Sequence, residues 1–316
     1  VGVAQVSALG PYLFAMYIAP LSNVIRSFGI NHHQYADDTQ LYITVLKDDV
    51  LSCVCRLESC INAVHKWLSQ NWLSLNPKKS ETIQFTSGRG QSRVEDIASI
   101  AVSGVRIKPS TVVKSLGVTL DGGLTFDQHI ANVCKASYFH IRALRHVRKS
   151  LPDDVAKTVA CSIVGSRIDY CNALLVGMSD SNFAKLQRVQ NTLARVVLGL
   201  RKFEHITPAL IELHWLPVKQ RVTFKLATLT MKTIHSGQPT YLRDLVNAYE
   251  PVRTLRSSSQ HLLCVGRTRT VTAARSFRHS SATIWNSLPA EIRDCTAVDN
   301  FKRKLKTHLF KLAFAA

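Results

Sequence analysis

The stretch from Gln34 to Ile43 constrains the fold most, because it sets two adjacent carboxylates between strand-forming residues. Aspartate is depleted in strand interiors and common in turns, whereas aromatic and β-branched residues favour half-buried strands. The stretch therefore predicts a strand, a tight turn and a second strand. We expect the turn to present the carboxylates of Asp37 and Asp38 together.

Two neighbouring carboxylates repel each other unless a positive charge lies between them. A hard divalent cation with oxygen ligands is the common source of that charge, and Mg²⁺ is the natural candidate. An ordinary surface turn is the alternative, and for an isolated pair of aspartates it is the more frequent case. The rest of the chain has to decide between the two.

Charge favours a polyanionic partner. The length of 316 residues is enough for two domains or for one domain with a large appendage, and 46% of the residues are hydrophobic. The chain carries a formal net charge of +19. Residues 1–50 hold two basic and four acidic residues, a net charge of −2, whereas residues 201–316 hold 19 basic and seven acidic residues, a net charge of +12. An acidic region in an otherwise basic chain is more typical of a protein that binds metal ions and a phosphate backbone than of a protein that is merely basic.

Membrane segments and structural metal sites are not predicted. No run approaches the roughly 18 apolar residues of a membrane span, and no signal peptide pattern is present, so we expect an intracellular protein of the cytoplasm, the nucleus or both. The eight cysteines form no C-x-x-C pairs. Cys53, Cys55, Cys60 and His65 are the one cluster, and their helical spacing does not converge on a tetrahedral point. We interpret these cysteines as reduced, buried thiols.

A second motif precedes the aspartates. Residues 2–14 form a lead rich in glycine, serine and proline that runs into an apolar helix over residues 12–18, with Pro11 in its first turn. Pro20 predicts a break before the pattern continues to Phe28. The backbone N–H groups of a loop that enters a helix can hold a phosphate or a sugar.

Together, the lead and the aspartate stretch resemble two sequence blocks of reverse transcriptases, most closely those of non-LTR (LINE-like) retrotransposons of the jockey and CR1 type. The lead is similar to the pattern G-x-P-Q-G-S-x-L-G-P-x-L-F, with Ala4 in place of the proline and Val6 in place of the second glycine. The Y-A-D-D motif from Tyr35 to Asp38 is intact. The resemblance implies an RNA-directed DNA polymerase, a nucleotidyltransferase that acts on an RNA template, a DNA primer and deoxynucleoside triphosphates.

The resemblance also implies roles for individual residues. Asp37 and Asp38 would hold catalytic Mg²⁺, with two ions in the intact enzyme. The residues that would contact the nucleotide and the template are Gln5, Ser7, Gly10 and Tyr35.

Two later stretches resemble further polymerase blocks. Residues 73–81 are similar to the pattern L-N-x-x-K-[TS]-E, which implies that Lys79 lies near the triphosphate and protonates the pyrophosphate as it leaves. The stretch itself predicts a turn that leads into a short strand after Lys79, and a solvated pair of lysines in that turn is the alternative to the catalytic role. Residues 112–121 are similar to the primer-grip pattern Y-L-G-V-x-x-D, with Leu116 and Gly117 as the matching core. A glycine in a strand indicates either the close approach of another backbone or a β-bulge.

Basic residues dominate the helix predicted over residues 126–149. The resemblance implies a polymerase thumb, in which Lys135, Arg142, Arg145 and Arg148 contact nucleic-acid phosphates; a solvated helix face is the alternative. The pattern also displays the side chains of His129, His140, His146 and Lys149.

A hairpin is predicted over residues 100–107, and further helices over 49–70, 152–165, 183–200, 218–235 and 298–312. Residues 253–278 predict a basic linker, for which RNA contact and disorder both stay open.

The expected fold class is α+β. We expect a truncated polymerase palm over residues 1–122, made of a small antiparallel sheet with packing helices; a helical thumb-like region over 123–200; and a basic, mostly helical region over 201–316. Reverse transcriptases carry a third metal-binding aspartate upstream of the lead, so we expect this chain alone not to polymerise DNA; Val6 adds to that expectation by crowding the lead. A non-catalytic nucleic-acid-binding remnant of a mobile element is the alternative. The sequence leaves the oligomeric state open.

Overall fold

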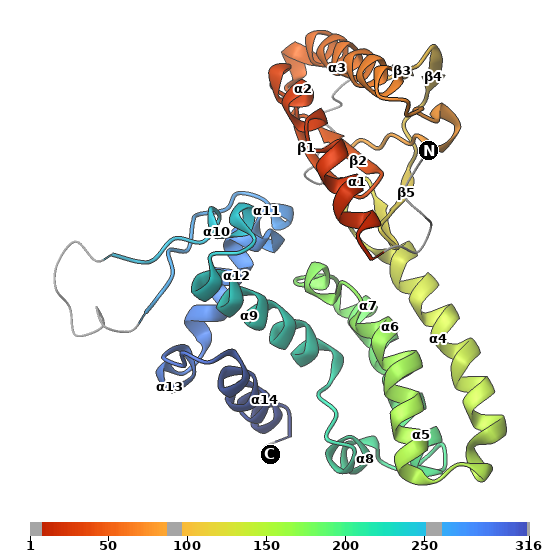
Figure 1. Cartoon of the computed structure of the whole chain (residues 1–316). Coiled ribbons are helices and arrows are strands. Elements are labelled where there is room, and N and C mark those ends of the chain that lie inside the picture. The colour runs from red at the N-terminus through yellow and green to blue at the C-terminus, as the bar shows by residue number, and fades with distance from the viewer. Residues whose placement is uncertain (1–7, 87–96, 251–260, 315–316) are drawn as a thin grey trace. The chain divides into compact units, whose positions relative to one another are not determined.

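The computed structural model describes residues 8–86, 97–250 and 261–314, and the chain divides into two units, Val1–Val113 and Lys114–Ala316. Helices predominate, accompanied by short two-stranded sheets (Figure 1), which confirms the α+β class. The predicted division at residues 122 and 200 stays a prediction.

Helices and two hairpins make up the first unit. Its elements are α1 (Gly10–Ile18), α2 (Leu21–Ser27), β1 (Asn31–Tyr35), β2 (Asp38–Tyr42), α3 (Val50–Gln70), β3 (Ile100–Val102) and β4 (Val105–Ile107). Pro11 lies in the first turn of α1, and α1 and α2 are separate helices on either side of Pro20, as predicted. A proline cannot donate the backbone hydrogen bond that a continuous helix would need there.

The core of the first unit lies between α2, α3 and the β1–β2 hairpin. Cys60, Val64 and Leu68 of α3 are buried against Leu21 and Ile25 of α2. Burying side chains of this size stabilises a fold by about 1.5–3 kcal/mol each. Burial also raises the pKa of the Cys60 thiol, so this thiol stays protonated. The expectation of buried cysteines is confirmed for two of the three in the cluster, because Cys55 is exposed.

The hairpin predicted over residues 100–107 is confirmed, with Val102 paired to Val105. The strand predicted after Lys79 is wrong. The chain passes through a short 3₁₀ turn (Pro77–Lys79), and Ile83 then forms a single bridge with Ser110. A strand needs hydrogen bonds to a neighbouring strand along its length. In this stretch the structure shows a backbone hydrogen bond from the Ser110 amide to the Thr82 carbonyl, at 2.7 Å.

The second unit is mainly helical. Its elements are β5 (Val112–Ser115, whose first two residues belong to the first unit), β6 (Val118–Asp121), α4 (Asp127–Val147), α5 (Asp153–Ala160), α6 (Ser166–Asp169), α7 (Asp180–Leu198), α8 (Ile206–Glu212), α9 (Val218–Ser236), α10 (Thr240–Arg243), α11 (Val271–Arg275), α12 (Phe277–Ser287), α13 (Ala290–Arg293) and α14 (Val298–Phe314). The helices predicted over 218–235 and 298–312 are confirmed as α9 and α14. The linker predicted over 253–278 lies in part outside the described residues, and it is wrong for residues 271–275, which form α11, and for residues 277 and 278, which begin α12.

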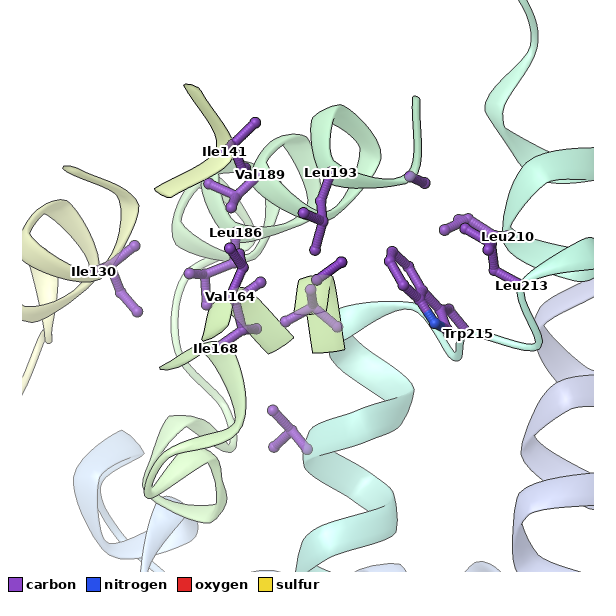
Figure 2. Packing of buried hydrophobic residues seen from close by; sticks show 14 of the residues in the cluster. Ile130, Ile141, Val164, Ile168, Leu186, Val189, Leu193, Leu210, Leu213 and Trp215 are labelled. Carbon is purple, nitrogen blue, oxygen red and sulfur yellow. The ribbon is translucent and has the colours of Figure 1, made fainter. Parts of the chain in front are cut away.

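Two cores organise this unit. In the first, Ile130 and Ile141 of α4 face Leu186, Val189 and Leu193 of α7 (Figure 2), and the two helices pack side by side. In the second, α9, α12 and α14 enclose the aromatic pair of Trp285 and Phe301, whose ring centroids are 5.8 Å apart. The first core fixes which face of α4 points to solvent.

Among the helices that the structure describes, none has both the length and the apolar character that a bilayer span requires.

Candidate active site and nucleic-acid interface

The two aspartates lie at the tip of the β1–β2 hairpin. Tyr35 pairs directly with Asp38, so the turn consists of Ala36 and Asp37 alone. Ala36 has a φ of +53°, a left-handed conformation that is uncommon for a residue with a Cβ atom. The strand, turn and strand order is as predicted, with one correction: Asp38 is the first residue of β2 and not part of the turn.

Exposed and half-buried residues alternate along both strands of the hairpin, so that it has an exposed face and an inner face. Tyr35 and Asp38 are cross-strand neighbours on the exposed face, together with His33 and Tyr42, whose rings stack at 5.3 Å. The inner face is fixed by Leu41, which packs on the core, and by Gln34. The Ser22 hydroxyl donates to the Gln34 side-chain oxygen at 2.6 Å and ties the hairpin to α2. The hairpin thus holds Asp38 in a defined orientation toward solvent.

The carboxylates of Asp37 and Asp38 are exposed, and within the described residues no basic side chain forms an ion pair with either. No group of three or more histidine, cysteine or acidic residues gathers into a metal site in the same part of the chain. Mg²⁺ in proteins is commonly held by one or two carboxylates together with substrate phosphates. The two carboxylates therefore fit a divalent cation whose remaining ligands come from elsewhere.

The other residues predicted to act with the aspartates are spread over the first unit. Gln5 and Ser7 lie outside the described residues. Gly10 is the first residue of α1, and Lys79 is exposed at the end of the 3₁₀ turn. Tyr35 lies on the exposed face of the hairpin with 68% of its surface accessible. Of this set, the structure brings Tyr35 alone into direct register with an aspartate.

Leu116 and Gly117 belong to the second unit and form the turn between β5 and β6. Their φ values are +44° and +81°, so Gly117 occupies a turn that suits glycine and not the strand interior that we expected. A side chain, and not the other backbone that we considered, approaches this glycine: a Cβ atom on Gly117 would lie 3.3 Å from Cε1 of Tyr170. The Tyr170 hydroxyl donates to the Leu116 carbonyl at 2.6 Å.

Helix α4 displays a basic and aromatic stripe, which we define by its exposed residues. They are Lys135, Tyr138, Phe139, Arg142, Arg145 and His146, together with Lys149 in the 3₁₀ turn (Arg148–Ser150) that follows α4. Spacings of three, four and seven residues place them on one side of the helix, opposite the apolar side that packs on α7. In the part of the chain that the structure describes, no acidic side chain pairs with a basic residue of this stripe.

Of the basic residues expected on this face, His140 is half-buried and is not part of the stripe, and two others lie elsewhere. His129 is buried with 6% of its surface accessible, and its Nδ1 accepts a hydrogen bond from the Thr119 amide at 3.3 Å. Burial lowers the pKa of His129, so the ring is neutral at pH 7. The Arg148 guanidinium donates to the carbonyls of Val197 and Leu151 and pairs with the Asp153 carboxylate. Both side chains are engaged inside the fold, because packing turns them away from the exposed stripe.

Comparison with known proteins identifies the first part of the chain. Residues 1–120 match the family described as Reverse transcriptase (RNA-dependent DNA polymerase). The chain is 27% identical over 141 residues to the RNA-directed DNA polymerase from mobile element jockey of Drosophila melanogaster, a match that covers 43% of this chain and 14% of that protein.

Two other relatives extend the similarity beyond the family match. The probable RNA-directed DNA polymerases from transposon BS and transposon X-element of Drosophila melanogaster are 26% and 23% identical over 208 and 222 residues. These matches cover 62% and 64% of this chain and 22% of each relative, so the chain spans less than a quarter of the proteins that it matches. No solved structure matches it. Residues 1–120 therefore belong to the reverse transcriptase family, and the chain is related to the RNA-directed DNA polymerases of non-LTR retrotransposons.

Proposed function

We propose that this chain supplies the metal-binding hairpin and a nucleic-acid-binding helix of the RNA-directed DNA polymerase of a non-LTR retrotransposon. The observation that carries the proposal is the hairpin at Asp37 and Asp38, whose exposed carboxylates lie within the residues that match the reverse transcriptase family. Template RNA, a DNA primer and deoxynucleoside triphosphates are the substrates that this function requires.

The reaction is nucleotidyl transfer, in which a primer 3′ hydroxyl attacks the α-phosphorus of a nucleotide and pyrophosphate leaves. Asp37 and Asp38 would hold the divalent ions, two in the intact enzyme. When bound, such ions stabilise the charge on the attacking and leaving oxygens. Tyr35, beside Asp38, would contact the nucleotide together with Gln5, Ser7 and Gly10, and the exposed ammonium of Lys79 would donate a proton to the pyrophosphate. Leu116 and Gly117 would contact the primer at the tip of their hairpin.

A complete two-metal site needs more carboxylates than the hairpin holds. Among the described residues, no third acidic side chain gathers with Asp37 and Asp38. We therefore propose that the 316-residue chain by itself does not extend a primer. A site that is short of one carboxylate lacks both the negative charge and the geometry that hold two cations together.

A chimaera tests this function. Residues 1–120 replace the matching segment of the jockey polymerase, and RNA-templated extension of a DNA primer is measured with Mg²⁺. We expect DNA synthesis that stops when EDTA removes the metal, and none from the 316-residue chain alone. A soluble, folded chimaera without synthesis would contradict the polymerase proposal. Synthesis by the isolated chain would contradict the proposed incompleteness.

The stripe on α4 favours a second candidate, a nucleic-acid-binding protein without catalysis. Lysine and arginine contacts to phosphates release counterions, so binding weakens as salt rises. Exposed Tyr138 and Phe139 add surfaces on which bases can stack. RNA binding that survives the double change Asp37→Ala and Asp38→Ala, together with an inactive chimaera, would support this candidate over the polymerase.

Replacing Lys135, Arg142 and Arg145 together by alanine is expected to weaken binding of an RNA–DNA duplex. The slope of log K against log salt should fall by about 2–3, because each lost phosphate contact lowers it by about 0.7–0.9. Titrations of fluorescent duplex at several salt concentrations measure both quantities. The matched control replaces three exposed lysines on other helices, Lys225, Lys232 and Lys306. An equal loss in that control would show that net charge, and not α4, explains the binding.

A further inference from the structure

The loop that leads into α4 has an unusual backbone. Leu124 and Phe126 have φ values of +51° and +63°, in the left-handed region that residues with a Cβ atom rarely adopt. Phe126 is also the N-cap residue of α4, since the Ile130 amide donates to its carbonyl at 2.9 Å. The loop conformation therefore sets the direction in which α4 leaves the β5–β6 hairpin. Strain of this kind persists only where the surroundings over-determine the backbone.

Two side chains hold the loop from its own neighbourhood. The Asp121 carboxylate accepts hydrogen bonds from the amides of Gly123, Thr125 and Phe126, at 3.2, 2.9 and 2.8 Å. Asn182 of α7 is fully buried and donates to the Thr125 carbonyl at 3.4 Å and to the Asp127 carboxylate at 2.7 Å. These contacts fix the loop to the hairpin and to α7.

A third side chain reaches the loop from the C-terminal region. Arg275 of α11 donates to the Leu124 carbonyl at 2.8 Å and to the Val176 carbonyl at 3.1 Å. Its guanidinium carbon lies 5.3 Å from the centre of the Phe126 ring. Its stem lies against Gly177, where an added Cβ atom would be 2.7 Å from Cγ of Arg275. The side chain thus joins α11 to both strained positions of the loop.

We propose that Arg275 is a positioning residue for nucleic-acid binding by α4. By bonding the Leu124 carbonyl and covering the Phe126 ring, it keeps the basic stripe of α4 and the Leu116–Gly117 turn in one fixed relative orientation. This gives the C-terminal region a role in binding that does not require it to touch the nucleic acid. The inference rests on the proposed function of α4.

The chemistry of the contact needs an arginine. A planar guanidinium can bond two carbonyls and stack on an aromatic ring at the same time, which the single ammonium of a lysine cannot do. Burial lowers the pKa of Arg275, and the nearby Asp121 carboxylate opposes that shift, so the group remains charged at neutral pH. Arg275→Lys therefore keeps the charge and the stem of the side chain while it loses the two-carbonyl contact.

The test compares Arg275→Ala with Arg278→Ala, which removes the same charge from an exposed position on α12. Both are made in the full chain, and duplex binding is measured at about 50 mM salt and below the unfolding transition. We expect Arg275→Ala to lower the duplex affinity about tenfold. The slope of log K against log salt should fall by about one unit, which corresponds to roughly one phosphate contact. The affinity of Arg278→Ala should stay within about twofold of the wild type. Hydrogen exchange should quicken in residues 121–126 of the Arg275→Ala chain.

The outcomes separate this inference from the proposed function. If the α4 triple variant loses binding while Arg275→Ala binds like the wild type, the positioning role is wrong and α4 remains the interface. If the triple variant binds like the wild type, the proposed role of α4 is wrong. An equal loss in Arg275→Ala and Arg278→Ala would show that charge alone is responsible and would overturn the inference. If Arg275→Ala fails to fold, Arg275→Lys provides the test. A loss of about threefold in duplex affinity supports the positioning role, and an unchanged affinity contradicts it.

Discussion

Replacing Asp38 by asparagine in the jockey chimaera is expected to lower the rate of RNA-templated DNA synthesis by about 10³-fold. Asparagine keeps the size of the side chain and removes the negative charge that a cation needs. Metal ions contribute several kcal/mol of charge stabilisation in the transition state, and a loss of about 4 kcal/mol corresponds to this factor. Asp37→Asn should have a loss of the same order. Single-turnover primer extension measures both.

Asp48→Asn is the matched control, because Asp48 is exposed in the same unit and lies outside the hairpin. Its rate should stay within about twofold of the parent chimaera, since surface changes away from special features have small effects. If Asp38→Asn keeps a tenth or more of the parent rate, the hairpin is not the metal site. If Asp48→Asn loses as much, the effect belongs to the overall charge of the unit.

Replacing Trp285 by alanine is expected to lower the free energy of unfolding of the second unit by about 3–5 kcal/mol. Trp285 has 2% of its surface accessible, stacks on Phe301 and donates from Nε1 to the His261 carbonyl at 2.9 Å. Alanine would leave a cavity between α12 and α14 and a carbonyl without this donor. Urea denaturation followed by far-UV circular dichroism measures the change.

Leu312→Ala on α14 is the control, since 65% of that side chain is accessible, and it should change the free energy of unfolding by less than about 0.5 kcal/mol. A loss below about 1 kcal/mol for Trp285→Ala would mean that the C-terminal helices do not share a packed core. The second core defined by Trp285 and Phe301 would then be wrong.

Much of the local structure could be predicted from the sequence, because local signals determine it. The break at Pro20 follows from the missing amide of proline. The helices α9 and α14 follow from apolar residues at helical spacing, and the hairpin at Tyr35 and Asp38 follows from turn-forming residues between strand-forming ones. Each of these signals lies within the element that it predicts.

The contacts that hold the candidate interface could not be predicted, because their partners are far apart in the sequence. Tyr170 and Leu116 are separated by 54 positions, and Arg275 and Leu124 by 151. Burial of polar side chains depends in the same way on distant packing. The sequence displays His129 with the basic residues, whereas in the structure it is buried and accepts a hydrogen bond from the Thr119 amide of β6. No local pattern distinguishes a basic residue held inside the fold from one on its surface.

The proposed function depends on the binding of a divalent cation by the hairpin at Asp37 and Asp38. The most direct test is paramagnetic broadening by Mn²⁺ of the amide signals of the 316-residue chain, because it does not depend on catalysis. We expect the signals of Ala36 to Thr39 to broaden first, and the double change Asp37→Asn and Asp38→Asn to remove this broadening. Equal broadening in the double variant, or broadening centred on Asp48 and Asp49 instead, would contradict cation binding by the hairpin.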